Sequence, residues 1–251
     1  MPRAGSVVAM SVAVTGRIPR LRPVRPGGWW FDLLMVALFA FLTAALASGH
    51  LLTLDQDVAN WIDGHQPAPL YWSARVLNYL GQGGQVLMPI AILSAGILAW
   101  RRRSVRPLLL FAAAFVLTYL TIGPLKVWGD RAAPGFDGPD KTMLFNPSAS
   151  GVEALSYPSG HVANSLVWYG VIAALLAALL GPGLSPQARL AIRLLPPVIV
   201  FCTTIYTNFH WLTDSIAGIL LGLVLTRLLA RVPWDDVPLP RLRGWERQAG
   251  L

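Results

Sequence analysis

The chain has 251 residues, of which 55% are hydrophobic and 13% are charged, and it carries a formal net charge of +8. Soluble domains carry about 25% charged residues, so this composition excludes an ordinary soluble globular protein and indicates a chain that lies in lipid. The single cysteine, Cys202, excludes a disulfide within the chain and cannot form a metal site alone. It lies in an apolar run, where we expect a small buried side chain.

The hydrophobic pattern predicts an all-α fold, a bundle of six membrane-spanning helices. Crossing a hydrocarbon core roughly 30 Å thick takes about 20 apolar residues, and several runs approach this length. The predicted spans are Phe31–Ser48, Val86–Trp100, Leu108–Leu125, Val162–Leu180, Ala191–Thr207 and Trp211–Ala230. The second run is short and contains Pro89, so we expect its helix to begin earlier, near Gly81–Gly84.

The segments outside the spans predict one membrane domain, residues 29–231, between two tails. Residues 1–28 are basic and proline-rich and are predicted to be a flexible tail, and residues 232–251 form a second tail. Between the first two spans, apolar residues recur at helical spacing from Leu54 to Ile62. This pattern predicts a short helix on the membrane surface.

Positive charge is distributed unequally across the predicted spans. The side that holds both chain ends contains Arg3, Arg17, Arg20, Arg22, Arg25, Arg101, Arg102, Arg103, Arg106, Arg189, Arg193, Arg227, Arg231, Arg241, Arg243 and Arg247. The other side contains Arg75, Lys126, Arg131 and Lys141. Because positive charge stays cytoplasmic, we expect both termini in the cytoplasm of a bacterial plasma-membrane protein. The basic balance is then a signal of membrane orientation, with anionic lipid as a secondary contact, and no nucleic-acid partner is expected.

Unexpected polar residues gather at the ends of three spans, all on the side opposite to the termini. They are Lys126 and Arg131 after the third span, Ser159 and His161 before the fourth, and His210 and Asp214 before or within the start of the sixth. Ionisable groups at a membrane boundary are costly unless they serve a function. Since helix ends that face the same side can converge in a bundle, we expect one extracytoplasmic site built from these residues.

The stretch FHWLTD places His210 and Asp214 four residues apart, on one helical face. A carboxylate there can accept the proton of one imidazole nitrogen, which leaves the other nitrogen as a nucleophile or base. This spacing is a weak pattern, and taken alone it favours a pair that only stabilises the helix.

The stretch YPSGH, residues 157–161, is typical of a helix start, with Ser159 as a possible N-cap. The free N–H groups and positive dipole end of that helix favour an anion, and Gly160 lets an anionic oxygen approach the backbone. His161 adds a titratable proton, and Lys126 adds a permanent positive charge. Together these groups predict a site for a tetrahedral oxyanion, most simply phosphate, although the stretch alone is also compatible with a plain turn.

In chain order, Lys126 with Pro134, PSGH at 158–161, and H-x3-D at 210–214 resemble the type 2 phosphatidic acid phosphatase (PAP2) superfamily. That family carries the motifs K-x6-R-P, P-S-G-H and S-R-x5-H-x3-D. The resemblance implies a six-helix membrane bundle with an extracytoplasmic active site. It also implies a phosphatase that hydrolyses a lipid phosphate without a metal or other cofactor.

The roles that the resemblance implies follow the motif positions. His210 would attack phosphorus and form a phosphohistidine, Asp214 would orient His210, and His161 would protonate the leaving group and then activate water. Lys126, together with Ser159 and Gly160, would hold the phosphoryl oxygens.

Two arginines of the family pattern are absent, and their positions hold Ala133 and Thr204. Arg131 is the expected substitute as a phosphate ligand, because the helix is ending there and the side chain is long. The alternatives for Arg131 are a salt bridge with Asp130 or Asp137, or contact with a lipid head group. Weaker candidates for the phosphate contact are Lys141 and Asn208.

The missing arginines leave two other functions open. One is a transferase that passes the phosphoryl or head group from His210 to an acceptor other than water. The other is a catalytically silent member that binds a lipid phosphate. The sequence is compatible with a polyprenyl or glycerolipid substrate, with a monophosphate or a diphosphate, and with any oligomeric state.

Overall fold

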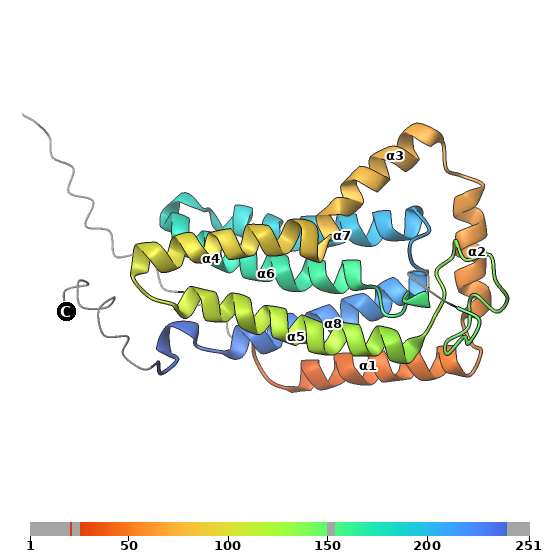
Figure 1. The fold of residues 1–251 in the computed structure, drawn as a ribbon, viewed down its shortest axis with the longest axis horizontal. Coiled ribbons are helices and arrows are strands. Elements are labelled where there is room, and N and C mark those ends of the chain that lie inside the picture. The colour runs from red at the N-terminus through yellow and green to blue at the C-terminus, as the bar shows by residue number, and fades with distance from the viewer. Residues whose placement is uncertain (1–20, 22–25, 150–153, 240–251) are drawn as a thin grey trace, which may run out of the picture.

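The structure, a computed structural model, describes residues 21, 26–149 and 154–239, and within these ranges it contains helices and no strand. Figure 1 shows long helices that run side by side, with two shorter helices beyond one end of the bundle. The helices are α1 Trp30–Ala47, α2 Leu52–Asp63, α3 Ala68–Leu77, η1 Asn78–Gly81, η2 Gly83–Leu87, α4 Met88–Arg102, α5 Arg106–Gly129, α6 Gly160–Leu180, η4 Gly181–Gly183, α7 Pro186–Tyr206, α8 Leu212–Arg231 and η5 Trp234–Asp236. Most of the predicted N-terminal tail and the last part of the C-terminal tail lie outside the described residues.

The six predicted spans are confirmed in number and order. The helices long and apolar enough to cross a membrane are Trp30–Ala47, Gly83–Arg102, Arg106–Gly129, Gly160–Gly183, Pro186–Tyr206 and Leu212–Arg231. The second begins at Gly83 with a π-helical turn, η2, so the helix does extend back into the glycine-rich stretch. Cys202 is exposed on α7, so the expected burial of this side chain is wrong.

The six spans alternate in direction, which gives the bundle two ends. We call the end with Ala47, Gly83, Gly129, Gly160, Tyr206 and Leu212 the site end, and the opposite end, with Trp30 and Arg231, the tail end. The segment between α5 and α6, which contains most of YPSGH, therefore lies at the site end together with α2 and α3 (Figure 1).

Helix α6 is the central helix of the bundle. Its span is 56% buried inside the protein, whereas the spans of α1, α5 and α7 are each 22% buried. Gly218 and Gly222 of α8 allow the closest approach to α6, because a Cβ on Gly218 would lie 2.7 Å from the Ser159 carbonyl oxygen. This is the helix packing that small residues four apart produce, and it holds the two helix starts of the predicted site together.

The segment between the first two spans forms two helices, α2 and α3, rather than the single surface helix predicted. Proline is compatible with the first turn of a helix, and Pro69 occupies that turn of α3. Trp72 and Val76 of α3 are more than 60% exposed. These apolar side chains fit a helix in contact with the membrane surface.

The tail end shows that the folded region extends past residue 231, the predicted domain boundary. Trp234 in η5 is buried in the hydrophobic core and donates a hydrogen bond from Nε1 to the Leu229 carbonyl oxygen (2.9 Å). Asp235 forms an ion pair with Arg102 of α4 (2.8 Å). The first residues of the predicted C-terminal tail are therefore part of the bundle.

Candidate active site

A cavity of about 790 Å³ opens at the site end, among the helix ends that the sequence predicted to converge. Residues from four separate segments line it: Gly81, Gln82, Gly83, Gly84, Met88, Lys126, Ala133, Gly135, Leu155, Ser156, Gly160, His161, Asn164, Thr207, Asn208, Phe209 and His210. Its volume lies within the range of small-molecule sites, and a phosphate group with its neighbouring atoms fits inside it.

Two histidines face each other in this cavity. The centroids of the His161 and His210 rings are 5.6 Å apart, and His161 Nδ1 lies 3.4 Å from His210 Nε2. His161 stands in the first turn of α6, and His210 lies in the short turn between α7 and α8. The predicted convergence of these two helix ends is therefore what the structure shows.

The connection between His210 and Asp214 passes through a serine that the sequence analysis did not select. His210 Nδ1 is 3.8 Å from Asp214 Oδ2, which is too long for a direct hydrogen bond. Ser156 Oγ lies between them, 2.6 Å from Asp214 Oδ2 and 3.0 Å from His210 Nδ1. A carboxylate only accepts, so the Ser156 hydroxyl donates to Asp214 and its oxygen accepts from His210 Nδ1–H. This network assigns the lone pair to His210 Nε2, the nitrogen that faces the cavity and His161.

Gln82 extends the same network on the other side of His161. Its side-chain Nε2 lies 3.2 Å from His161 Nε2, and an amide NH₂ can only donate. His161 Nε2 is then the acceptor, so the proton of the neutral ring sits on Nδ1, next to His210. The backbone around Gln82 approaches closely because Gly81 has no side chain; a Cβ there would lie 3.2 Å from the His161 Cβ.

Lys126 is the lysine that the cavity contains, and Gly160 makes room for it. A Cβ on Gly160 would lie 3.0 Å from Lys126 Cε, so a larger residue would displace the lysine side chain. Lys126 Nζ donates a hydrogen bond to the Leu155 carbonyl oxygen, which fixes it beside the histidines. The glycine thus admits the lysine, a role that the sequence reasoning had not assigned to it.

Ser159 caps α6 and does not line the cavity. Its Oγ accepts from Val162 N at 3.5 Å, which confirms the predicted N-cap, and its side chain is fully buried. Its backbone N–H donates to the Asp214 carbonyl oxygen (2.9 Å) and so ties the start of α6 to α8. In this structure Ser159 positions the helix start rather than presenting a hydroxyl to phosphate.

The expectation that Arg131 contacts phosphate is not met by its position. The guanidinium is fully buried and lies outside the cavity lining. It donates to Asp214 Oδ1 (2.6 Å) and Asp55 Oδ2 (2.7 Å), and its Nε donates to the Thr142 carbonyl oxygen (2.8 Å). The predicted alternative of a salt bridge was correct in kind but wrong in partner, since neither Asp130 nor Asp137 takes part. The partner was predicted wrongly because Asp55 lies in α2, a helix that was not expected to contribute to the site.

Asp55 of α2 completes a buried charge cluster behind the histidines. Its Oδ1 accepts from Thr213 N (3.0 Å), and its Oδ2 accepts from the Thr213 hydroxyl and from Arg131. Arg131 therefore bridges two carboxylates that would otherwise repel each other, and it stabilises Asp214 in its ionised form. The ring of Trp211 covers the guanidinium, with Cζ 5.5 Å from the ring centroid.

The positions of the two missing family arginines are occupied differently. Thr204 is fully buried, and its hydroxyl donates to Asn78 Oδ1 (2.7 Å), so an arginine side chain would have no room at this position. Ala133, by contrast, lines the cavity. Of the weaker candidates, Lys141 donates to the Pro134 carbonyl oxygen (3.0 Å). Asn208 lines the cavity and donates to Asp63 of α2.

Burial and charge act in opposite directions on His210. Burial lowers the pKa of His210 below its ordinary value of 6.5, and the Asp214 carboxylate partly opposes that shift. The net effect keeps the ring neutral at physiological pH, which is the form in which Nε2 has a lone pair. Within residues 21, 26–149 and 154–239, no group of three or more His, Cys, Asp or Glu residues is arranged to hold a metal ion.

Comparisons with known proteins identify the family of this chain. The model of the PAP2 superfamily matches residues 107–238. Phosphatidylglycerophosphatase B of Bacillus subtilis (strain 168) is 31% identical over 153 residues, which are 59% of this chain and 68% of that protein. A crystal structure described as the first transmembrane PAP2-type phosphatidylglycerolphosphate phosphatase, from Bacillus subtilis, has the same fold. Its TM-score is 0.65 at 23% identity, covering 80% of this chain and 94% of that one. The chain therefore belongs to the PAP2 superfamily and is an integral membrane lipid phosphatase, a hydrolase of phosphoric esters.

Proposed function

We propose that this protein removes a terminal phosphate from a membrane lipid by transferring the phosphoryl group to His210 and then to water, without a metal ion. The observation that carries the proposal is the hydrogen-bonded series Gln82–His161–His210–Ser156–Asp214, in which every donor and acceptor is used in one direction. That arrangement leaves the nucleophilic Nε2 of His210 and the proton-donating Nδ1 of His161 facing each other across the part of the cavity where the phosphoryl group would bind.

In the first step the lone pair of His210 Nε2 forms a bond to phosphorus, and the bond between phosphorus and the ester oxygen breaks. His161 takes up a second proton when the phosphate binds and enters this step as the imidazolium; it gives its Nδ1 proton to the departing alkoxide and becomes neutral, so the lipid leaves as an alcohol. The two nitrogens are 3.4 Å apart, so the phosphoryl group must enter between them and separate the rings. Lys126 stabilises the charge on the phosphoryl oxygens.

In the second step His161 Nδ1 takes a proton from a water molecule, and the water oxygen attacks the phosphorus of phosphohistidine. The P–N bond breaks, its electrons return to His210 Nε2, and inorganic phosphate leaves. Asp214 stays ionised throughout because Arg131 and Ser156 both donate to it. Its charge favours the imidazolium character that His210 gains in the first transition state.

As substrate we propose a phosphate monoester on a glycerolipid, in the class of phosphatidylglycerophosphate. The support is the printed name of the relative from Bacillus subtilis and the presence of one lysine with no arginine in the cavity lining. A monoester carries less charge than a diphosphate and needs fewer cations. We also propose that the site end faces the extracytoplasmic side, because the arginine-rich tail end fits the cytoplasmic side.

The test is phosphate release in detergent, in the presence of EDTA, from phosphatidylglycerophosphate, phosphatidic acid and a polyprenyl diphosphate. His210→Ala is expected to lower kcat by about 10³-fold or more, and His161→Ala by about 10²–10⁴-fold. His65→Ala is the matched control, because His65 is an exposed histidine at the same end, and it should leave kcat within about twofold.

The outcomes separate the proposed phosphatase from the two alternatives. If wild type and His210→Ala release phosphate equally slowly, the chain binds lipid phosphate without hydrolysing it. If a labelled product grows only when an alcohol acceptor is added, the chain is a transferase. Loss of activity in EDTA that zinc or magnesium restores would contradict the metal-independent mechanism.

A further inference from the structure

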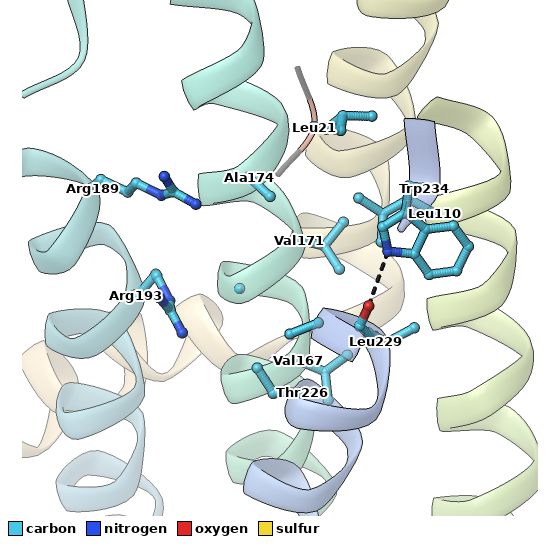
Figure 2. Close-up of a pocket in the computed structure, with 12 residues that line it drawn as sticks. Leu21, Leu110, Val167, Val171, Ala174, Arg189, Arg193, Thr226, Leu229 and Trp234 are labelled. Carbon is cyan, nitrogen blue, oxygen red and sulfur yellow. Dashed lines mark hydrogen bonds between the residues drawn. The ribbon is translucent and has the colours of Figure 1, made fainter. Parts of the chain in front are cut away.

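A second cavity lies at the tail end, on the far side of the bundle from the histidines. Its volume is about 50 Å³, and its walls come from α5, α6, α7, α8 and η5, with Leu21 of the N-terminal segment also in contact. Most of its lining is apolar, but Arg189 and Arg193 of α7 also line it. Figure 2 shows both arginine side chains extending from α7 toward α6, on the side of Ala174.

These two arginines differ from their neighbours at the tail end. Arg227 and Arg231 bind Asp32, and Arg106 donates to the Val237 carbonyl oxygen. In the described part of the chain, the side chains of Arg189 and Arg193 have neither an ion pair nor a hydrogen bond, although both residues are half-buried. They are also four residues apart, so they share a helical face and repel each other.

Two half-buried positive charges that repel each other attract a negatively charged group to the space between them. The cavity is too small for a whole lipid, since a single water occupies about 30 Å³ of liquid volume. The outer face of α7, however, exposes Leu190, Leu194 and Val198 beside the two arginines, each more than 50% exposed. A molecule with a compact anionic group and long apolar chains fits both features.

We propose that Arg189 and Arg193 bind the phosphate of one anionic phospholipid from the leaflet at the tail end. The phosphate lies between the two guanidinium groups at the cavity, and the acyl chains lie along the apolar face of α7. Bidentate contact between guanidinium and phosphate is the strongest form of this interaction. The site is separate from the catalytic cavity and does not depend on the proposed mechanism.

The experiment measures lipid retention by native mass spectrometry, with the full-length protein purified in detergent and titrated with phosphatidylglycerol or phosphatidylcholine. Wild type should retain one phosphatidylglycerol at concentrations where it retains no phosphatidylcholine. The double variant R189Q/R193Q should bind phosphatidylglycerol at least about tenfold more weakly, because each basic residue near an anionic lipid contributes severalfold to affinity. Phosphate release from the catalytic site should stay within about twofold of wild type, which also shows that the variant folds.

Two further variants keep the test specific. R101Q/R103Q removes the same charge from exposed arginines at the same end, and it should retain the lipid. Ala174→Phe fills the cavity without changing charge and should weaken phosphatidylglycerol binding as R189Q/R193Q does. Equal weakening in both charge variants, or none in either, would overturn the site and indicate general attraction to the tail end.

Two other occupants of the cavity have their own outcomes. If 10 mM inorganic phosphate displaces the bound phosphatidylglycerol from wild type completely, the arginines bind a free anion and the lipid proposal fails. Glu246 lies outside the described residues and is an acid of the C-terminal segment. If wild type retains no phosphatidylglycerol and Glu246→Gln retains one, the chain's own acid occupies the arginines and the proposal fails for the native chain.

Discussion

At the scale of single residues, the main finding is that Ser156 stands between His210 and Asp214. The family motifs imply a direct contact between these two residues, but the distance of 3.8 Å leaves room for the Ser156 hydroxyl. Ser156 is 2% exposed and has both partners at hydrogen-bond distance. It is therefore a positioning residue that fixes the tautomer of His210.

Ser156→Ala is expected to lower kcat by about tenfold to a hundredfold, since a hydrogen bond to a charged group contributes about 1.5–3 kcal/mol. KM should change less than about twofold, because Ser156 acts on His210 and not on the lipid. Ser156→Thr keeps the hydroxyl and should recover part of the loss. Ser148→Ala, in the same loop but exposed, is the control. An unchanged kcat in Ser156→Ala would show that Asp214 contacts His210 directly.

The pH dependence of kcat/KM tests the state of His210. Burial lowers the pKa of His210 below 6.5, so the ring stays neutral and nucleophilic below that pH. Activity should therefore decline only at pH values lower than 6.5 as the ring becomes protonated. Asp214→Asn should move this acid limb lower still, because the carboxylate favours the protonated ring. An acid limb at or above pH 6.5 in wild type would contradict the assignment.

Ala133 occupies the position of one arginine of the family motif, and substitution by arginine would restore that positive charge. Its side chain lines the cavity, so Ala133→Arg should place a guanidinium near the phosphoryl oxygens and tighten vanadate binding by about tenfold. Thr204→Arg should not tighten binding, because Thr204 is fully buried against Asn78 and a larger side chain has no room. It should instead lower the melting temperature. Unchanged vanadate binding in Ala133→Arg would show that the cavity already satisfies its anion.

At the scale of helices, α2 contributes to the candidate site although, with 12 residues, it is too short to cross a membrane. Asp55 holds Arg131 and Thr213, and through them it fixes the start of α8, where Asp214 lies. Asp55→Asn leaves Arg131 with less compensating charge, and breaking a buried pair costs about 3–5 kcal/mol. The melting temperature and kcat should both fall clearly, whereas the exposed neighbour variant Asp57→Asn should behave as wild type. A normal melting temperature in Asp55→Asn would show that α2 is dispensable for the site.

The sequence predicted the six spans and the short helix α2, but it missed α3 and the contribution of α2 to the site. Span length and apolar composition are imposed by the bilayer, so the six spans could be recognised to within a few residues. No helix was predicted over α3, Ala68–Leu77. The position of Arg131 was missed because its partner, Asp55, lies in α2, 76 residues earlier in the chain. No local pattern encodes such a contact.

The site residues that belong to a recognisable motif could be predicted from the sequence. The residues that reach the site only because several segments meet there could not. His161, His210, Asp214 and Lys126 were recognised from their spacing and lie together as expected. Ser156 and Gln82 gave weaker signals: one directly precedes YPSGH, and the other lies in a glycine-rich stretch. Those glycines permit the close backbone approach that brings Gln82 to His161, and this reason became visible only in the packed structure.

At the scale of the whole molecule, the two ends differ in charge, and the proposed orientation follows from this difference. Two single-cysteine variants on a Cys202→Ser background test it, Ser73→Cys on α3 at the site end and Gln187→Cys at the tail end; both positions are exposed. In intact spheroplasts, a membrane-impermeant maleimide should label Ser73→Cys at once and Gln187→Cys only after lysis. The reverse pattern would place the active site in the cytoplasm and contradict the proposed topology.

The central claim is that His210 Nε2 carries the phosphoryl group during turnover, and trapping this intermediate is its most direct test. The enzyme is mixed with a lipid carrying ³²P in its terminal phosphate, quenched in base within milliseconds, and digested for peptide mapping. We predict a base-stable, acid-labile label on the peptide that contains residue 210, present in wild type during turnover and absent in His210→Ala. Turnover by wild type without this label, or the same label in His210→Ala, would contradict the account.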